Sequence, residues 1–231
     1  ANDGISQSGI DDLTAAGFEV LTTTVAQEQL ENFINTENIV ALLVRSATTV
    51  RQDLIDACPN LKIIGRGGVG MDNIDVEYAR EKGLSVINTP AASSESVAEL
   101  VFAHLFSGVR FLYDSNRTMP LEGESKFKNL KKAYAKGTEL RGKTLGVIGF
   151  GRIGQATAKM ALGLGMKVIA FDPFLEKTTL SLSFHDGQTV DFEIKTVSKE
   201  TVLKESDFIT LHVPAQKDFV IGEAEFELMK D

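Results

Sequence analysis

The sequence predicts an α/β protein made of two doubly wound parallel-sheet domains. Short apolar runs of strand length alternate with helical stretches through residues 18–87, as is typical of parallel sheets covered by helices. A second series of strands and helices begins at Gly142 and contains a glycine-rich turn. A length of 231 residues accommodates two ordinary domains. We therefore expect one domain at residues 1–92 and another at residues 93–231.

The first domain is expected to hold strands and helices in alternation. The expected strands are Phe18–Thr22, Val40–Val44, Leu61–Ile64 and Leu84–Ile87, and the expected helices are Arg51–Ala57 and Ile74–Lys82. Thr89 and Pro90 then interrupt the pattern. Ser93 or Ser94 is placed to cap a long helix from Glu95 to about Phe111, which leads into the second domain.

The stretch from residue 144 to residue 173 carries the most specific pattern in the chain. An expected strand, Leu145–Ile148, runs into a turn with Gly149, Gly151 and Gly154, and an expected helix, Ile153–Leu164, follows. The first glycine permits the tight bend, the second lets backbone approach a pyrophosphate, and the third lets the helix pack on the strand. The unpaired N–H groups at the start of that helix would face the phosphates.

An acidic residue stands where a dinucleotide site needs one. Asp172 follows the next expected strand, Met166–Phe171, where a carboxylate can accept hydrogen bonds from the ribose hydroxyls of adenosine. Because a carboxylate there repels a ribose phosphate, we expect NAD rather than NADP. Arg152 inside the turn and Lys177 just beyond the acid leave dual use open.

Residues 179–195 break the alternation of strands and helices. Apolar residues alternate with polar ones on both sides of the pair Asp186–Gly187; they are Leu180, Leu182, Phe184, Val190, Phe192 and Ile194. This pattern predicts an inserted β-hairpin. Its role stays open between surface decoration and a part in oligomer contacts or regulation.

Basic residues follow two neighbouring strands of the first domain. Arg45 and Ser46 come after Val44, and Arg66 stands in a glycine run that ends at Gly70. Ligands of open parallel sheets bind beyond the carboxyl ends of the strands. A guanidinium beside flexible backbone N–H groups suits a carboxylate or phosphate, so we expect a small anionic substrate. The alternative is a tight turn with an ordinary surface arginine.

The histidines form no metal-binding pattern with cysteines or clustered acids, so we expect no metal. The last expected strand, Asp207–His212, is followed by Val213 and Pro214 near the cofactor edge. For its histidine a backbone or ribose contact is favoured over a role as catalytic base, because no carboxylate is spaced to orient it. His104 is expected in the interior or at an interface, and His185 is expected to be exposed.

Bulk properties exclude several classes of partner. A net charge of −8 argues against nucleic-acid binding, and the longest apolar stretch, Val97–Phe106, is too short to span a membrane. Cys58 is the only cysteine, so no internal disulfide can form and we expect a reducing, cytoplasmic location with a structural role for this thiol. Residues 125–143 are strongly basic, with Glu139 as their only acid, and suit a solvated connector and an anion site equally.

Together these motifs resemble the D-2-hydroxyacid dehydrogenase family, most closely its D-3-phosphoglycerate dehydrogenase branch. The resemblance covers VRSATTV at 44–50, GRGGVGMDNIDVEYAREKGLSVINTP at 65–90, SVAEL at 96–100, KGTELRGKTLGVIGFGRIG at 136–154 and FITLHVP at 208–214. It implies a flavodoxin-like substrate domain and a Rossmann NAD-binding domain. It also implies a homodimer formed chiefly through the NAD-binding domain.

The resemblance also assigns roles to residues. Substrate would be held by Arg45, Ser46, Arg66, Gly68, Val69 and Gly70, and Lys132 falls where phosphoglycerate-specific relatives use a basic residue that reaches the partner subunit's site. The cofactor would be held by Val69, Gly149, Gly151, Arg152, Ile153, Gly154, Asp172, His212, Val213 and Pro214. No catalytic residue is expected within the chain. The family's arginine, glutamate and histidine are expected beyond Asp231, and the family's first strand before Ala1, in a longer protein.

The leading functional hypothesis is NAD-dependent interconversion of 3-phosphoglycerate and 3-phosphohydroxypyruvate, on the route to serine. A glyoxylate or hydroxypyruvate reductase is the close alternative, for which the cations Arg45 and Lys132 would be unnecessary. An NAD-sensing corepressor built on the same fold is a more distant one, because the chain is acidic and carries no partner-binding signature.

Overall fold

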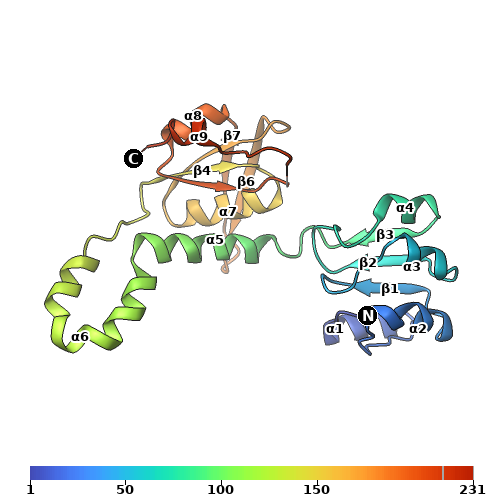
Figure 1. Cartoon of the computed structure of the whole chain (residues 1–231). Helices are drawn as coiled ribbons and strands as arrows, with labels where there is room; N and C mark the ends of the chain where they lie inside the picture. The colour runs from blue at the N-terminus through green and yellow to red at the C-terminus, as the bar shows by residue number, and fades with distance from the viewer. Residues whose placement is uncertain (215, 231) are drawn as a thin grey trace. The chain divides into compact units, whose positions relative to one another are not determined.

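The computed structural model describes residues 1–214 and 216–230, and the chain divides into two compact units, Ala1–Ser93 and Ser94–Asp231 (Figure 1). Each unit contains a parallel three-stranded sheet with helices packed against it. The α/β class with parallel sheets expected from the sequence is therefore confirmed.

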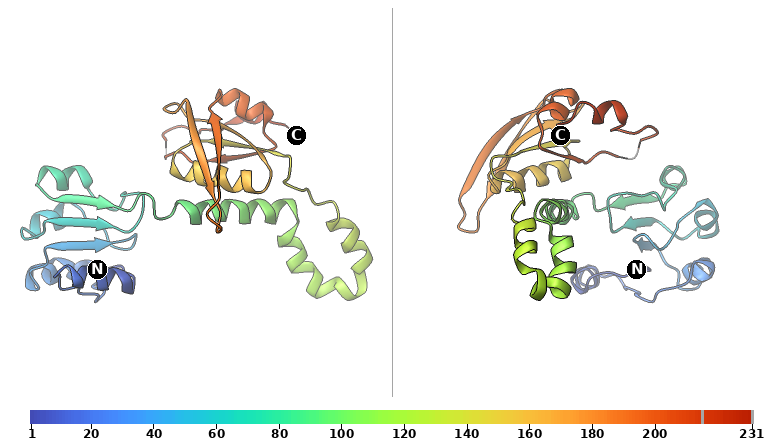
Figure 2. Two further views of the ribbon diagram at one scale, coloured as in Figure 1. Left: turned by 180° about the vertical axis from the view of Figure 1, so that it is seen from behind. Right: turned by 60° about the vertical axis from the view of Figure 1, so that its left-hand side comes forward.

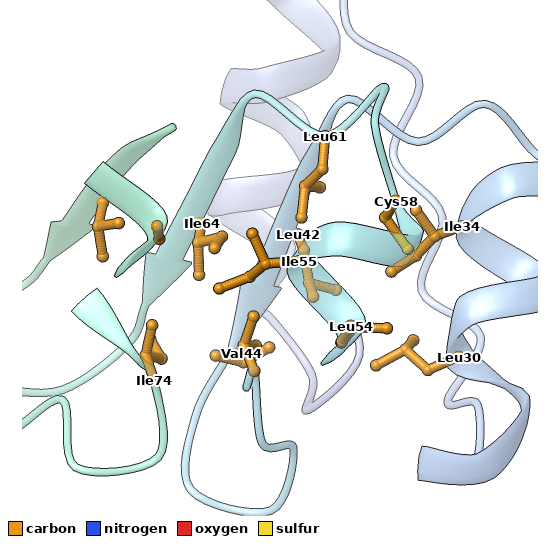
Figure 3. Packing of buried hydrophobic residues seen from close by; sticks show 13 residues of the cluster. Leu30, Ile34, Leu42, Val44, Leu54, Ile55, Cys58, Leu61, Ile64 and Ile74 are labelled. Carbon is orange, nitrogen blue, oxygen red and sulfur yellow. The ribbon is translucent and has the colours of Figure 1, made fainter. Parts of the chain in front are cut away.

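The sheet of the first unit has the order β1-β2-β3, and its strands run parallel. The elements of this unit are α1 (Gln7–Ala15), η1 (Gln27–Gln29), α2 (Leu30–Thr36), β1 (Ala41–Val44), α3 (Gln52–Ala57), β2 (Ile63–Arg66), α4 (Val76–Glu81) and β3 (Ser85–Asn88). Leu42, Ile64 and Val86 lie side by side in register. They share one buried cluster with side chains of α2, α3 and α4, as Figure 3 shows for most of its members. Burial of each such side chain contributes about 1.5–3 kcal/mol.

The strand expected at Phe18–Thr22 does not form, and that prediction was wrong. A strand needs a hydrogen-bonded partner, and in the described residues the sheet of this unit begins at β1. The segment instead lines an apolar groove with residues of β1, and Phe18 is 53% exposed. The apolar alternation that suggested a strand therefore serves to line this groove.

The second unit has a central strand covered on both faces. Its sheet order is β5-β4-β8, with β4 (Thr144–Ile148), β5 (Lys167–Phe171) and β8 (Phe208–Leu211) parallel. Leu145 and Val147 join a cluster with α5 (Ser94–Val109) and α7 (Arg152–Gly163), whereas Ile148 packs with α8 (Lys199–Glu205). Helices therefore cover both faces of the sheet. The carboxyl end of β4 leads into the glycine turn, where ligands of such sheets bind.

The predicted hairpin is confirmed. Strands β6 (Lys177–Ser183) and β7 (Thr189–Lys195) pair antiparallel, with Leu180 opposite Phe192. Leu180 is only 1% exposed and belongs to the core cluster that includes α7, while a bridge from Ala170 to Thr196 attaches the end of β7 to β5. Figure 2 shows that the β6–β7 hairpin crosses α7 and that its tip extends past α5.

The helix expected from Glu95 to about Phe111 is confirmed as α5, but a further helix was missed. Helix α6 (Leu112–Tyr134) takes up the first part of the basic segment that begins at residue 125. It bends at Lys126 and contains Pro120, a residue that normally ends a helix, so the sequence did not indicate one continuous helix here. None of its residues is buried. The last helix of the unit is α9 (Glu223–Phe226). Among the described residues, no helix has the length and apolarity to cross a membrane.

Candidate functional site

The glycine turn of the second unit has the geometry of a strand-to-helix bend. Gly149 follows β4 with φ +90°, and a Cβ there would lie 2.5 Å from the carbonyl oxygen of His212. A Cβ on Gly154 would overlap the carbonyl oxygen of Gly149 and lie 3.2 Å from Cγ1 of Val147. Both glycines are therefore required by backbone conformation or close packing.

Gly151 is different, because it faces open space. It is the N-cap of α7, no side chain caps this helix, and a Cβ on it would meet no atom within 4 Å. The neighbouring side chain of Arg152 is exposed and that of Ile153 is half-buried. The first N–H groups of the 12-residue helix are thus left for an anion, which the positive end of the helix dipole favours.

Asp172 is tied to the turn by its backbone contacts. Its Oδ2 accepts a hydrogen bond from the Phe150 N–H at 2.7 Å, and its Oδ1 accepts one from the Phe174 N–H at 2.9 Å. Each carboxylate oxygen keeps a further lone pair, and the side chain is half-buried. The carboxylate is therefore fixed in orientation and still able to accept from hydroxyl groups.

His212 lies beside the same turn. Its N–H donates to the Ile148 carbonyl at 2.8 Å, and its ring Nε2 is hydrogen-bonded to the hydroxyls of Thr210 at 3.1 Å and Thr157 at 3.3 Å. Burial lowers the pKa of His212 below its ordinary value. Among the described residues no carboxylate is hydrogen-bonded to the ring, so a role as catalytic base has no support there. Val213 and Pro214 follow His212 along the chain.

The first unit aligns its candidate anion site at the carboxyl ends of its strands. Val44, Arg66 and Asn88 stand opposite one another in the register of β1, β2 and β3. Arg45 and Ser46, which follow β1, are exposed. The structure thus brings Arg45, Ser46 and Arg66 to one edge of this sheet.

Arg66 is partly engaged by its own unit. Its Nε donates to the Arg45 carbonyl at 3.2 Å, and its Nη1 lies 3.7 Å from a carboxylate oxygen of Asp72. Because the Asp72 side chain is 88% exposed, this ion pair is weak. A Cβ on Gly70 would lie 3.1 Å from Nη1 of Arg66, and a Cβ on Gly68 3.7 Å from its Cζ, so the glycine run folds closely over the guanidinium.

The glycine run begins with a tight turn, in which the Gly68 N–H donates to the Arg66 carbonyl at 3.0 Å. Neither Gly68 nor Gly70 has a positive φ, and between them Val69 is 42% exposed. The Val69 carbonyl accepts a hydrogen bond from the Asn88 side chain at 2.7 Å, and the Gly68 carbonyl accepts one from the Thr89 N–H at 3.1 Å. With its carbonyls bonded inward to the sheet, the run keeps its exposed side toward solvent.

Other singled-out residues fall into three groups. Lys132 is exposed on α6, and His185 is exposed beside the hairpin turn as expected. His104 is exposed on α5, so it does not lie in the interior of the unit, and the interface position expected as the alternative stays a prediction. Cys58 is 2% exposed and burial raises its pKa, which confirms a structural thiol. In the described part of the chain, no group of three or more potential ligands is placed to hold a metal ion.

Two residues near the anion site were missed from the sequence. Asp3 and Asn73 hydrogen-bond to the backbone of residues 45–48 from distant points in the chain. Both stand beside glycine or aspartate in turn-like segments, so local composition gave no sign of these long-range contacts.

An open glycine turn at a helix N-terminus, with a fixed carboxylate after the next parallel strand, defines an α/β protein of the dinucleotide-binding type. The family model of the D-isomer specific 2-hydroxyacid dehydrogenase catalytic domain matches residues 2–213. The chain therefore belongs to this family.

Known relatives support the same assignment. The chain is 44% identical over 215 residues to a hydroxypyruvate reductase of Thermotoga maritima, covering 92% of this chain and 64% of the relative. It is 39% identical over 230 residues to a D-3-phosphoglycerate dehydrogenase of Archaeoglobus fulgidus, covering 98% of this chain and 40% of the relative. The chain thus spans less than two thirds of the length of these relatives. The NAD⁺-bound structure of 3-phosphoglycerate dehydrogenase from Entamoeba histolytica superposes with a TM-score of 0.69 at 27% identity, covering 100% of this chain and 67% of that one.

Proposed function

We propose that this chain forms the NAD-binding part and much of the substrate-binding part of a dehydrogenase that interconverts 3-phosphoglycerate and 3-phosphohydroxypyruvate, an early step toward serine. The observation that carries the proposal is that the chain contains both the open Gly151 turn, in the second unit, and Arg45 and Arg66 at one sheet edge of the first unit. The names of the relatives, which include phosphoglycerate dehydrogenases, agree with it.

The residues of the second unit fit NAD. Gly151 leaves the space that a pyrophosphate would fill, and the carboxylate of Asp172 is oriented for ribose hydroxyls. Bound NAD⁺ supplies the acceptor for the hydride that leaves the hydroxyl-bearing carbon of the substrate. Arg152 and Lys177 remain the only argument for NADP, and Lys177 lies 3.6 Å from the carboxylate of Glu193 on the hairpin.

The residues of the first unit fit a substrate with two anionic groups. Arg45 and Ser46 offer exposed donors, and the backbone of Val69 and Gly70 adds N–H groups beside Arg66. Their task is to bind and orient a carboxylate and a phosphate. Proton transfer requires an acid/base group, and the ring of His212 is bonded to two threonine hydroxyls rather than to a carboxylate. We propose that the acid/base residue lies beyond Asp231.

We also propose a homodimer formed through the second unit, with α6 in the contact. Leu121 is 85% exposed, Tyr113 66% and Phe127 53%, although α6 buries no residue in the isolated chain. Lys132, exposed on the same helix, would then reach the partner subunit's site. Leu121→Asp should lower the mass measured by sedimentation from dimer to monomer. Asp114→Asn, also on α6, is the matched control and should leave the mass unchanged.

The test of the reaction is NADH oxidation by the purified protein with 3-phosphohydroxypyruvate, hydroxypyruvate or glyoxylate. We expect selectivity for the phosphorylated acid, and Lys132→Ala should raise its KM about tenfold while Lys128→Ala, on the same exposed helix, does not. A hydroxypyruvate reductase, favoured by the 44% identity to the Thermotoga protein, predicts no phosphate preference and no effect of Lys132→Ala. If NADH binds without turnover, the relative affinities for the three acids decide between the phosphoglycerate dehydrogenase and the hydroxypyruvate reductase.

A further inference from the structure

We name residues 45–48 the arginine loop. Two side chains that are distant from it in sequence, Asp3 and Asn73, hold this loop. The carboxylate of Asp3 accepts hydrogen bonds from the N–H of Arg45 at 2.6 Å, the N–H of Thr48 at 3.1 Å and the hydroxyl of Thr48 at 2.5 Å. The side-chain amide of Asn73 donates to the carbonyls of Arg45 at 2.8 Å and Thr48 at 2.7 Å. Asp3 thus binds donors of the loop, and Asn73 binds its backbone acceptors.

These contacts are specific in orientation. Hydrogen bonds to an ionised carboxylate are about twice as strong as neutral ones. Asn73 is 6% exposed, and its Oδ1 has no hydrogen-bond partner. A flipped amide would direct that oxygen at two carbonyls, so only the observed orientation is compatible with the loop. The orientation that binds both loop carbonyls thus leaves the amide oxygen of Asn73 without a hydrogen-bond partner among the described residues.

The arginine loop is buried at Thr48 and exposed to solvent at Arg45 and Ser46. Thr48 is 3% exposed and also accepts a hydrogen bond from the Asn2 side chain at 2.8 Å. Arg45 and Ser46, by contrast, are exposed. Asp3 itself contacts the backbone N–H of Arg45 rather than its guanidinium, which leaves the positive charge of that side chain available.

We propose that Asp3 and Asn73 are positioning residues that preorganise the arginine loop so that Arg45 and Ser46 meet an anionic substrate without first being ordered. This inference rests on the proposed function, since it assigns the same edge of the sheet to substrate. Groups that are already fixed lose little conformational entropy on binding, which raises affinity without adding contacts.

The electrostatics agree with this role. Burial raises the pKa of Asp3, but the hydrogen bonds from Thr48, from the Arg45 N–H and from the Ala47 N–H outweigh burial and place the pKa below its ordinary value. The carboxylate is therefore charged at neutral pH and retains all its acceptor sites.

The experiment compares the affinity of the chain for 3-phosphoglycerate, measured by calorimetry with saturating NAD⁺, among Asp3→Asn, Arg45→Gln and the double variant. Asp12→Asn is the matched control, because Asp12 is an exposed acid of the same unit. Amide hydrogen exchange at Arg45 and Thr48 is followed in parallel. We expect Asp3→Asn to weaken binding about tenfold and to speed exchange at both amides about tenfold or more. The further loss should be clearly smaller when Arg45 is already replaced, because only the positioning of Ser46 is then lost, whereas general damage would weaken both backgrounds equally.

Each outcome has a separate meaning. If Arg45→Gln binds as tightly as the wild type, the proposed substrate site is wrong and the inference falls with it. If Arg45→Gln weakens binding but Asp3→Asn does not, the positioning role alone is overturned. If Asp3→Asn does not fold, Asn73→Ala replaces it with the same expectations. Failure of both variants to fold would make the two residues structural and would also overturn the proposal.

Discussion

Gly151→Ala separates cofactor binding from folding at the glycine turn. Gly151 has φ −72°, and a Cβ there would meet no atom within 4 Å, so an alanine fits the folded chain without strain. Alanine is a poorer N-cap than glycine, and we expect a loss of about 0.5–1 kcal/mol in the free energy of unfolding. The added methyl group nevertheless stands where backbone is expected to approach the pyrophosphate.

The loss of binding follows from the contacts that the methyl group displaces. A hydrogen bond to a charged group contributes about 1.5–3 kcal/mol. Displacing one from the pyrophosphate should therefore weaken NADH binding roughly 10- to 150-fold. The assay is a fluorescence titration of NADH, with a urea denaturation of the same samples.

Gly163→Ala provides the control within the same helix. A Cβ at Gly163 also meets no atom within 4 Å, but this residue lies at the far end of α7. Alanine should stabilise that helix by about 0.5–1 kcal/mol and leave NADH affinity unchanged. If Gly151→Ala bound NADH like the wild type, the turn would not be the pyrophosphate site, and the reasoning from its open space would be refuted.

Four further predictions concern stability and reactivity. Gly154→Ala should cost at least about 3 kcal/mol in urea denaturation, because its Cβ would overlap a backbone carbonyl; a loss below about 1 kcal/mol would contradict the packing role. Leu180→Ala should cost about 2–5 kcal/mol, and an unchanged urea midpoint would mean that the hairpin is not anchored through this 1% exposed side chain. The folded pKa of His212 lies below its unfolded value, so stability should decline as pH falls from 7.5 to 5.5. His212→Gln should make the decline measured by urea denaturation smaller, and an unchanged decline would contradict this contribution. Cys58, buried and with a raised pKa, should react with iodoacetamide only in denaturant, and rapid labelling of the native chain would show that it is accessible.

The strongest sequence signals were those enforced by local geometry. The hairpin was predictable because Asp186–Gly187 supports a tight turn, and the residues around it alternate with a period of two. The glycine turn was predictable because Gly149 must adopt a positive φ between a buried strand and a helix. In both cases a few adjacent residues contain the whole constraint.

The predictions that failed did so for separate physical reasons. Phe18–Thr22 has strand-like composition, but a strand exists only where a partner completes its ladder, and the local sequence does not contain the partner. Helix α6 was missed because Pro120 and Gly123 stand in its interior, and both residue types normally mark the end of a helix. His104 was expected in the interior or at an interface because its neighbours are apolar, and its side chain is exposed on α5, which rules out the interior.

The sequence by itself determined the parallel α/β class, the dinucleotide-binding pattern and the hairpin, because periodicity, turn chemistry and motif spacing are local properties. Only the tertiary structure decided that Arg66 holds the Arg45 carbonyl, and that Asp3 and Asn73 bind the same loop from 42 and 28 residues away. Contacts at such separations depend on how the sheet and its loops pack. Neither residue type nor spacing along the chain encodes which distant donor will meet which acceptor.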